Sequence, residues 1–153
     1  MSAAPQRVGI DVLARTLDGL LAVERYDDYA PNGLQVEGRR DVARVVTGVS
    51  ANGALIERAL EAGADAIVVH HGFFWRNEPR TLVGVRAARV GALLRAGVSL
   101  LAYHLPLDGH ATLGNNAQML AALSLTPCGE FAVGGGLRAP VGEWATARTA
   151  VEV

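Results

Sequence analysis

Two adjacent histidines, His70 and His71, are the residues of this 153-residue chain whose types and spacing best suit chemistry. His104 and Asp108 lie four residues apart further along, so the group supplies three imidazoles and one carboxylate. Borderline divalent ions such as zinc prefer these ligands. A histidine near a strand end can also be a hydrogen-bonded core residue, so the spacing makes a metal site a hypothesis with a structural alternative.

The adjacency of His70 and His71 restricts how the pair could bind metal. Successive side chains of an extended segment point to opposite faces, so the two rings cannot easily grip one ion. Two ions about 3.5 to 4 Å apart, each taking one histidine, would fit the pair without backbone strain. Such a centre needs more anionic ligands than Asp108 alone supplies.

Neighbouring residues are open to more than one interpretation. His104 could hydrogen-bond to a metal-binding residue and orient it without binding the metal itself, or it could anchor the turn that follows it. Asp108, which precedes a glycine, could be a turn residue, and His110 is expected to be solvated. The aromatic run 73–75 could form the wall of a pocket, or it could pack against neighbouring loops or a subunit.

Strands that alternate with helices would position these residues. The apolar run Ala66 to Val69 predicts a buried strand that leads into His70, and Val98 to Tyr103 predicts another that leads into His104. Because the carboxyl ends of neighbouring parallel strands share one edge of a sheet, we expect the histidines at one crevice.

The remaining periodicity completes an α/β pattern in one domain over residues 1–153. Ser50 is placed to cap a helix that ends at Gly63, and Asn115 and Asn116 can cap another. The repeat of strand, helix and strand predicts a mostly parallel sheet flanked by helices. The other expected elements are a helix over 10–23, strands over 34–36 and 43–49, a helix from about 80 to 96, and a helix over 117–123.

The end of the chain is rich in glycine and proline. Residues 127–142 are expected to form a hinge or a pair of short edge strands, and residues 143–153 could form one amphipathic helix. An end so soon after this stretch is abrupt for an α/β domain, so truncation after 127–142 is one hypothesis for the single domain, and a naturally shortened form is the other.

Composition limits the classes of partner. The formal charge of -1 gives no broad attraction to phosphate backbones, so nucleic acid is an unfavourable partner. No apolar run approaches the roughly 20 residues that a spanning helix needs, so no membrane association is expected. Cys128 is the only cysteine, and the amino end lacks a signal-peptide pattern, which together favour the cytoplasm.

Three segments of the chain resemble the Nif-three-like family, whose bacterial members are dinuclear-metal hexameric proteins and type-two homologues of a GTP cyclohydrolase. Segment 28–38 resembles the family's Asn-Gly-Leu-Gln-Val signature, and segment 68–75 resembles its double-histidine motif. Segment 103–118 resembles its His-x-x-x-Asp and Gly-Asn-Asn loop. The three motifs occur in the family's order, and the resemblance therefore implies a Nif-three-like fold.

The resemblance implies that His70 and His71 bind different ions of a pair and that Asp108 binds one of them. The family's remaining ligands, a histidine and a bridging glutamate four residues apart, have no counterpart after His110. We expect either the amino-terminal part of a longer protein, or a shortened member that borrows ligands from another subunit or has lost tight binding. The resemblance also implies a toroidal homohexamer.

The leading functional hypothesis is a metal-dependent hydrolase, resembling a GTP cyclohydrolase, with two divalent ions per subunit and a nucleotide or phosphate-bearing substrate. The alternative is a non-catalytic, ring-forming metal-binding scaffold. Imidazole and carboxylate suit zinc, iron, manganese and nickel alike, so the residues do not identify the metal.

Overall fold

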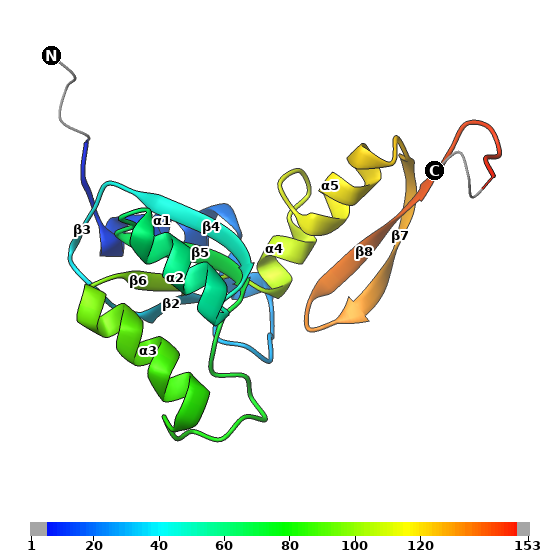
Figure 1. Cartoon of the computed structure of the whole chain (residues 1–153). Helices are drawn as coiled ribbons and strands as arrows, with labels where there is room; N and C mark the ends of the chain where they lie inside the picture. Colours follow the sequence, from blue (N-terminus) through cyan, green and yellow to red (C-terminus); the bar gives the residue numbers. More distant parts are fainter. Residues whose placement is uncertain (1–5, 150–153) are drawn as a thin grey trace, which may run out of the picture.

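A four-stranded mixed sheet forms the centre of the computed structural model, which describes residues 6–149 (Figure 1). The sheet has the order β2–β6–β5–β4, in which β4, β5 and β6 run parallel and β2 pairs antiparallel with β6. The predicted α/β fold with a mostly parallel sheet is thus confirmed. The strands are β2 (Gly33–Val36), β4 (Val45–Ser50), β5 (Ala66–His71) and β6 (Ser99–Ala102).

Helices cover both faces of this sheet because the side chains of its central strands alternate between two apolar cores. Ile67 and Val69 of β5 pack in the core that includes residues of α2 (Gly53–Glu61) and α3 (Gly84–Ala96). Leu101 of β6 points the other way, into the core formed with α1 (Ile10–Leu20). Strands buried on both faces have near-continuous apolar sequences, as these do.

The other elements lie outside the main sheet. The glycine- and proline-rich stretch forms an antiparallel hairpin of β7 (Thr126–Gly134) and β8 (Leu137–Glu143). The alternative of two strands is therefore confirmed, but the strands form a sheet of their own and are not short edge strands. This hairpin stands apart from the sheet and lies beside α5 (Figure 1). The remaining elements are β1 (Val8–Gly9), which pairs with β3 (Asp41–Val42), and the helices η1 (Val23–Arg25), α4 (Leu105–Gly109) and α5 (Asn115–Ala122).

Two helix caps differ from the prediction. The side chain of Asn52, not Ser50, caps α2 by accepting a hydrogen bond from the Leu55 N–H at 2.9 Å. Ser50 is still part of β4, where its hydroxyl is turned toward a histidine. Asn115 and Asn116 lie within the first turn of α5 because the helix begins directly after Gly114, and their side chains are used by Asp108 instead.

The helix predicted over residues 143–153 is wrong in the part that the structure describes. Glu143 is the last residue of β8, and residues 144–149 contain no helical turn. The Trp144 indole N–H donates to the Leu123 carbonyl at 2.7 Å, so the segment packs by a side-chain bond to the end of α5. Residues 150–153 of the predicted helix lie outside the described residues. Over residues 6–149, no helix combines the length and the apolar character needed to cross a bilayer.

Asp65 fastens the loop before β4 to the start of β5, and it makes stability depend on pH. Its Oδ2 accepts hydrogen bonds from the backbone N–H groups of Ala43 and Arg44, at 2.9 and 3.0 Å. The Ala43 bond is the main cause that lowers the pKa of Asp65; burial opposes it, and the Arg44 N–H and the Arg39 charge add to the lowering. A carboxyl whose folded pKa lies below its usual value stabilises the fold above that value and loses this contribution as pH falls.

We therefore expect Asp65→Asn to lower the free energy of unfolding by about 1 kcal/mol near neutral pH, and by much less at about pH 3. Urea unfolding at both pH values measures the difference. Glu57→Gln, on the exposed face of α2, is the matched control and should change little at either pH. If Asp65→Asn lowered the free energy of unfolding by the same amount at both pH values, this assignment would be contradicted.

Candidate metal centre

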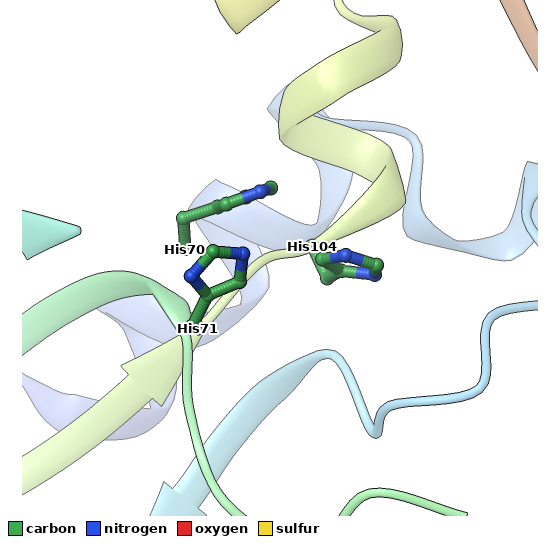
Figure 2. Close-up of side chains that lie close together, drawn as sticks. All are labelled: His70, His71 and His104. Carbon is green, nitrogen blue, oxygen red and sulfur yellow. The ribbon is translucent and has the colours of Figure 1, made fainter. Parts of the chain in front are cut away.

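The neighbouring strands β5 and β6 bring His70, His71 and His104 together at the carboxyl edge of the sheet (Figure 2). Each residue offers one ring nitrogen, and these nitrogens all lie within 4.8 Å of one another. The ring centroids of His70 and His71 are 4.4 Å apart, and those of His70 and His104 are 5.0 Å apart. The three histidines therefore lie together at one edge of the sheet, as the arrangement of the predicted strands implied.

The rings of His70 and His71 lie side by side, although alternation along a strand predicts opposite directions. The reason is that β5 ends at His71 and each ring is held from a different neighbouring strand. His70 turns toward the carbonyl of Tyr103, which follows β6, whereas His71 turns toward Ser50 of β4. Adjacency in sequence therefore does not by itself require that the two rings serve different ions.

Each of the three rings has its Nδ1 atom occupied by an oxygen. Nδ1 of His70 lies 3.0 Å from the Tyr103 carbonyl, and Nδ1 of His104 lies 3.0 Å from Asp28 Oδ1. Because a carbonyl and a carboxylate only accept, both rings donate from Nδ1, which leaves Nε2 with its lone pair when the ring is neutral. Ser50 Oγ, 3.0 Å from Nδ1 of His71, can accept in the same way. Such oxygen partners commonly fix the tautomer of metal-binding histidines.

The surroundings of His71 favour its neutral form. Burial is the largest cause that lowers the pKa of His71, and the charges of protonated His70 and His104 lower it further, while Asp108 opposes them. Since metal ions bind the unprotonated nitrogen, a lowered pKa keeps this ring available as a ligand near neutral pH.

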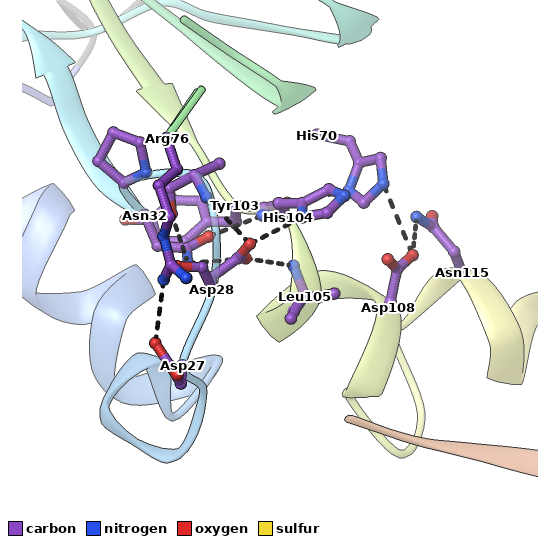
Figure 3. Close-up of polar contacts among 12 residues, drawn as sticks. Asp27, Asp28, Asn32, His70, Arg76, Tyr103, His104, Leu105, Asp108 and Asn115 are labelled. Carbon is purple, nitrogen blue, oxygen red and sulfur yellow. Dashed lines mark hydrogen bonds and ion pairs between the residues drawn. The ribbon is translucent and has the colours of Figure 1, made fainter. Parts of the chain in front are cut away.

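Asp108 reaches the cluster from α4, the short helix that follows His104 (Figure 3). Its Oδ1 lies 3.6 Å from Nε2 of His70, and the same oxygen accepts a hydrogen bond from the Asn115 side chain at 2.9 Å. The Asn116 side chain donates to the Asp108 carbonyl at 3.1 Å. The carboxylate predicted from sequence is thus beside the histidines. Asn115 holds the carboxylate and Asn116 holds the backbone of the same residue, whereas sequence reasoning assigned both amides to helix capping.

His110 has a different position from the other histidines. Its Nδ1 accepts from the backbone N–H groups of Thr112 and Leu113, at 3.3 and 3.0 Å, so the ring closes its own loop. It is not one of the three histidines whose nitrogens converge.

Asp28 and Asn32 hold His104 in place, and sequence reasoning missed both roles (Figure 3). Only 2% of the Asp28 side chain is exposed, and its oxygens accept from the backbone N–H groups of Ala30 and Leu105 as well as from Asn32 and His104. Asn32 Oδ1 accepts the backbone N–H of His104 at 2.7 Å. Burial by itself raises the pKa of Asp28, but these bonds, with His104 first, outweigh it and the pKa is lowered.

Two aromatic rings form a wall beside the cluster. The centroid of Trp75 lies 5.1 Å from that of His104 and 5.9 Å from that of His71, and Tyr29 lies 5.0 Å from His104. Phe73 instead belongs to the apolar core, where it is 6% exposed. The interpretation of the aromatic run as the wall of a pocket therefore holds for Trp75, whereas Phe73 packs in the core of the domain and not against a loop or a subunit.

The chain passes close to β2 and β6 directly after the histidines, and the lack of a side chain at Gly72 allows this approach. A Cβ at this position would overlap the side chains of Gln35 and Ala102. The same Gln35 side chain accepts the Phe73 N–H at 2.6 Å, which fastens the segment after β5 to β2. Phe74 adopts a left-handed backbone with φ of 66°, an unfavourable conformation of the kind that packing sustains near functional sites.

Comparison with known proteins gives a match to one family model and to curated relatives. A family model described as Duf34/NIF3 (NGG1p interacting factor 3) matches residues 8–150. A protein of Allochromatium vinosum named GTP cyclohydrolase 1 type 2 homolog is 53% identical over 125 residues, which cover 82% of this chain and 49% of that protein. The chain spans about half the length of the curated relatives it matches.

Solved structures agree with the fold. The structure of protein ybgI, described as of unknown function, has a TM-score of 0.79 and 45% identity, covering 80% of this chain and 50% of that one. The crystal structure of TTHA1606 from Thermus thermophilus has a TM-score of 0.78 and 39% identity, covering 86% of this chain and 53% of that one.

Proposed function

This chain belongs to the Duf34/NIF3 family, and from that premise we propose that it binds divalent metal and supports hydrolysis of a nucleotide or another phosphate-bearing substrate. The observation that carries the proposal is the convergence of three imidazoles within 4.8 Å beside the carboxylate of Asp108. The names of the relatives, as homologues of a GTP cyclohydrolase, support a nucleotide as the first substrate class to test.

The donor set fits a divalent ion. We propose His70, His71 and Asp108 as ligands of a two-ion centre, as the family resemblance implies. In each histidine the Nδ1 contact leaves Nε2 available, and imidazole with carboxylate suits zinc, iron, manganese or nickel. His104 offers a further Nε2 atom to the same space, and its contact with the buried Asp28 fixes the direction of its ring.

A divalent ion in such a site supplies Lewis acidity toward water and phosphoryl oxygens. The residues of the chain would orient the metal ligands and contact the substrate. Asn115 holds the Asp108 carboxylate in one orientation, and Trp75 and Tyr29 offer aromatic surfaces on which a planar base could stack. Their rings would also exclude water from one side of the cluster.

The proposal predicts metal-dependent turnover. Purified protein reloaded with a divalent metal should hydrolyse GTP, another nucleotide or a simple phosphoester, and His70→Ala should reduce the rate by at least about 100-fold because a ligand is lost. Chromatography of the reaction products and a phosphate-release assay measure the rate. His110→Ala, which removes a histidine outside the cluster, is the control. Absence of turnover for every one of these substrates with each metal would refute the hydrolase.

A further inference from the structure

A separate hollow of about 330 Å³ adjoins the histidine cluster between the end of β4 and the first turns of α3. His71 and Trp75 form the side that it shares with the cluster. Ser50, Asn52, Arg86 and Arg89 line the rest of its polar surface, together with Glu78. A ligand in this hollow would therefore contact the same histidine that we propose as a metal ligand.

The charge in this hollow is positive. Arg86 and Arg89 lie three residues apart on α3, a spacing that places both side chains on one face of a helix. Arg86 is paired, because its guanidinium donates to the Glu78 carboxylate and to the Pro79 carbonyl. Arg89 is half-buried and makes no hydrogen bond or ion pair within residues 6–149. One guanidinium charge is thus left without a partner at the wall of the hollow.

The neutral groups of the hollow add donors and not acceptors. Asn52 uses its side-chain oxygen to cap α2, which leaves its amide N–H₂ free to donate. When Ser50 Oγ accepts from His71, the hydroxyl proton is also free. The first turn of α3 contains no acidic residue, and its N-cap, Val83, has no side chain that could accept from the helix. Converging donors with one excess positive charge suit an anionic ligand.

We propose that this hollow, which we name the Arg89 pocket, binds an oxyanion group of the substrate, a phosphate or a carboxylate. The inference rests on the proposed function and narrows its substrate to molecules with an anionic group next to the reacting bond. Arginine suits this role because its planar guanidinium can contact two oxygens of one anion at once.

The test is anion binding by metal-free protein, with pyrophosphate and malonate as probes in separate titrations followed by calorimetry. Arg89→Ala should weaken binding of the preferred probe at least about tenfold, since a hydrogen bond to a charged group is lost. Arg89→Lys should restore part of the affinity because the charge returns without the planar donor pair. Arg95→Ala removes the same charge from an exposed position near the end of α3 and should bind as wild type does.

Preference for pyrophosphate would identify a phosphate site, and preference for malonate a carboxylate site; either supports the inference. Equal affinity of wild type and Arg89→Ala, or no binding of either probe at about 10 mM, a concentration well above a millimolar dissociation constant, would overturn it. Metal content of the same preparations, measured after a portion of each is reloaded with divalent metal, keeps the two proposals distinct. Protein that binds the anion but no metal would support the Arg89 pocket and contradict the proposed hydrolase. Protein that binds metal but neither anion would overturn the pocket and leave the proposed hydrolase standing.

Discussion

Replacing both His70 and His71 with alanine is expected to remove nearly all divalent metal from the purified protein, to less than about a tenth of the wild-type content. Two of the three converging imidazoles disappear, and the remaining ring of His104 cannot hold an ion with Asp108 alone against competing chelators. The fold should tolerate the change, because His70 and His71 are the last two residues of β5 and neither belongs to the apolar cores. Elemental analysis after reloading with each metal gives the measurement.

The matched control for this double variant is His110→Ala. His110 lies in the same part of the chain but turns its Nδ1 to its own backbone, so its loss should leave the metal content unchanged. Metal content that is equal in the double variant and in wild type would end the assignment of His70 and His71 as ligands.

Removal of the Asp28 carboxylate should give the second large effect, a loss of about 3 kcal/mol or more in the free energy of unfolding. Asp28→Ala leaves the backbone N–H groups of Ala30 and Leu105, the Asn32 amide and the His104 ring without their common acceptor. The Ala30, Leu105 and His104 donors would be left unsatisfied in a site where the side chain of Asp28 is almost completely buried. The Asn32 amide would keep only its long hydrogen bond of 3.5 Å to the Ala30 carbonyl. The midpoint of urea unfolding measures the loss.

The adjacent aspartate provides the control. Asp27 is 87% exposed in its side chain and pairs with Arg76 at 3.1 Å on the surface, where an ion pair contributes little. Asp27→Ala should therefore lower the free energy of unfolding by no more than about 0.5 kcal/mol. Similar losses for the two variants would show that the network around Asp28 does not support the fold in the way described.

The elements that position the site could be predicted from sequence because their signals are local. The apolar runs before His70 and His104 specify strands buried on both faces, and strands of that type place their carboxyl ends at one edge of a parallel sheet. Gly63 was also predicted correctly as the residue that ends α2, since its φ of 69° is one that glycine adopts readily.

The partners of the site residues could not be predicted in this way because they are distant in sequence. Asp28 contacts His104 across 76 positions, and Ser50 contacts His71 across 21. Local rules assign such polar residues to turns and caps, which is the role that Ser50 was given and that Asn52 has. The motif containing Asp28 and Asn32 carried a signal, but only as a family resemblance.

Several expectations from the sequence stay predictions. They are the two ions per subunit, the ligand roles of His70, His71 and Asp108, the toroidal homohexamer, and the cytoplasmic location.

The central position of β5 has a consequence for how metal would be captured. This strand is hydrogen-bonded to β4 on one side and β6 on the other, and the carbonyl of His71 itself accepts the Ala51 N–H at 2.8 Å. The main chain that carries both rings is thus already ordered before any ligand arrives, so binding would require only small rotations of side chains. The entropic penalty of association should be correspondingly small, and loading should leave the backbone nearly superimposable on the empty form.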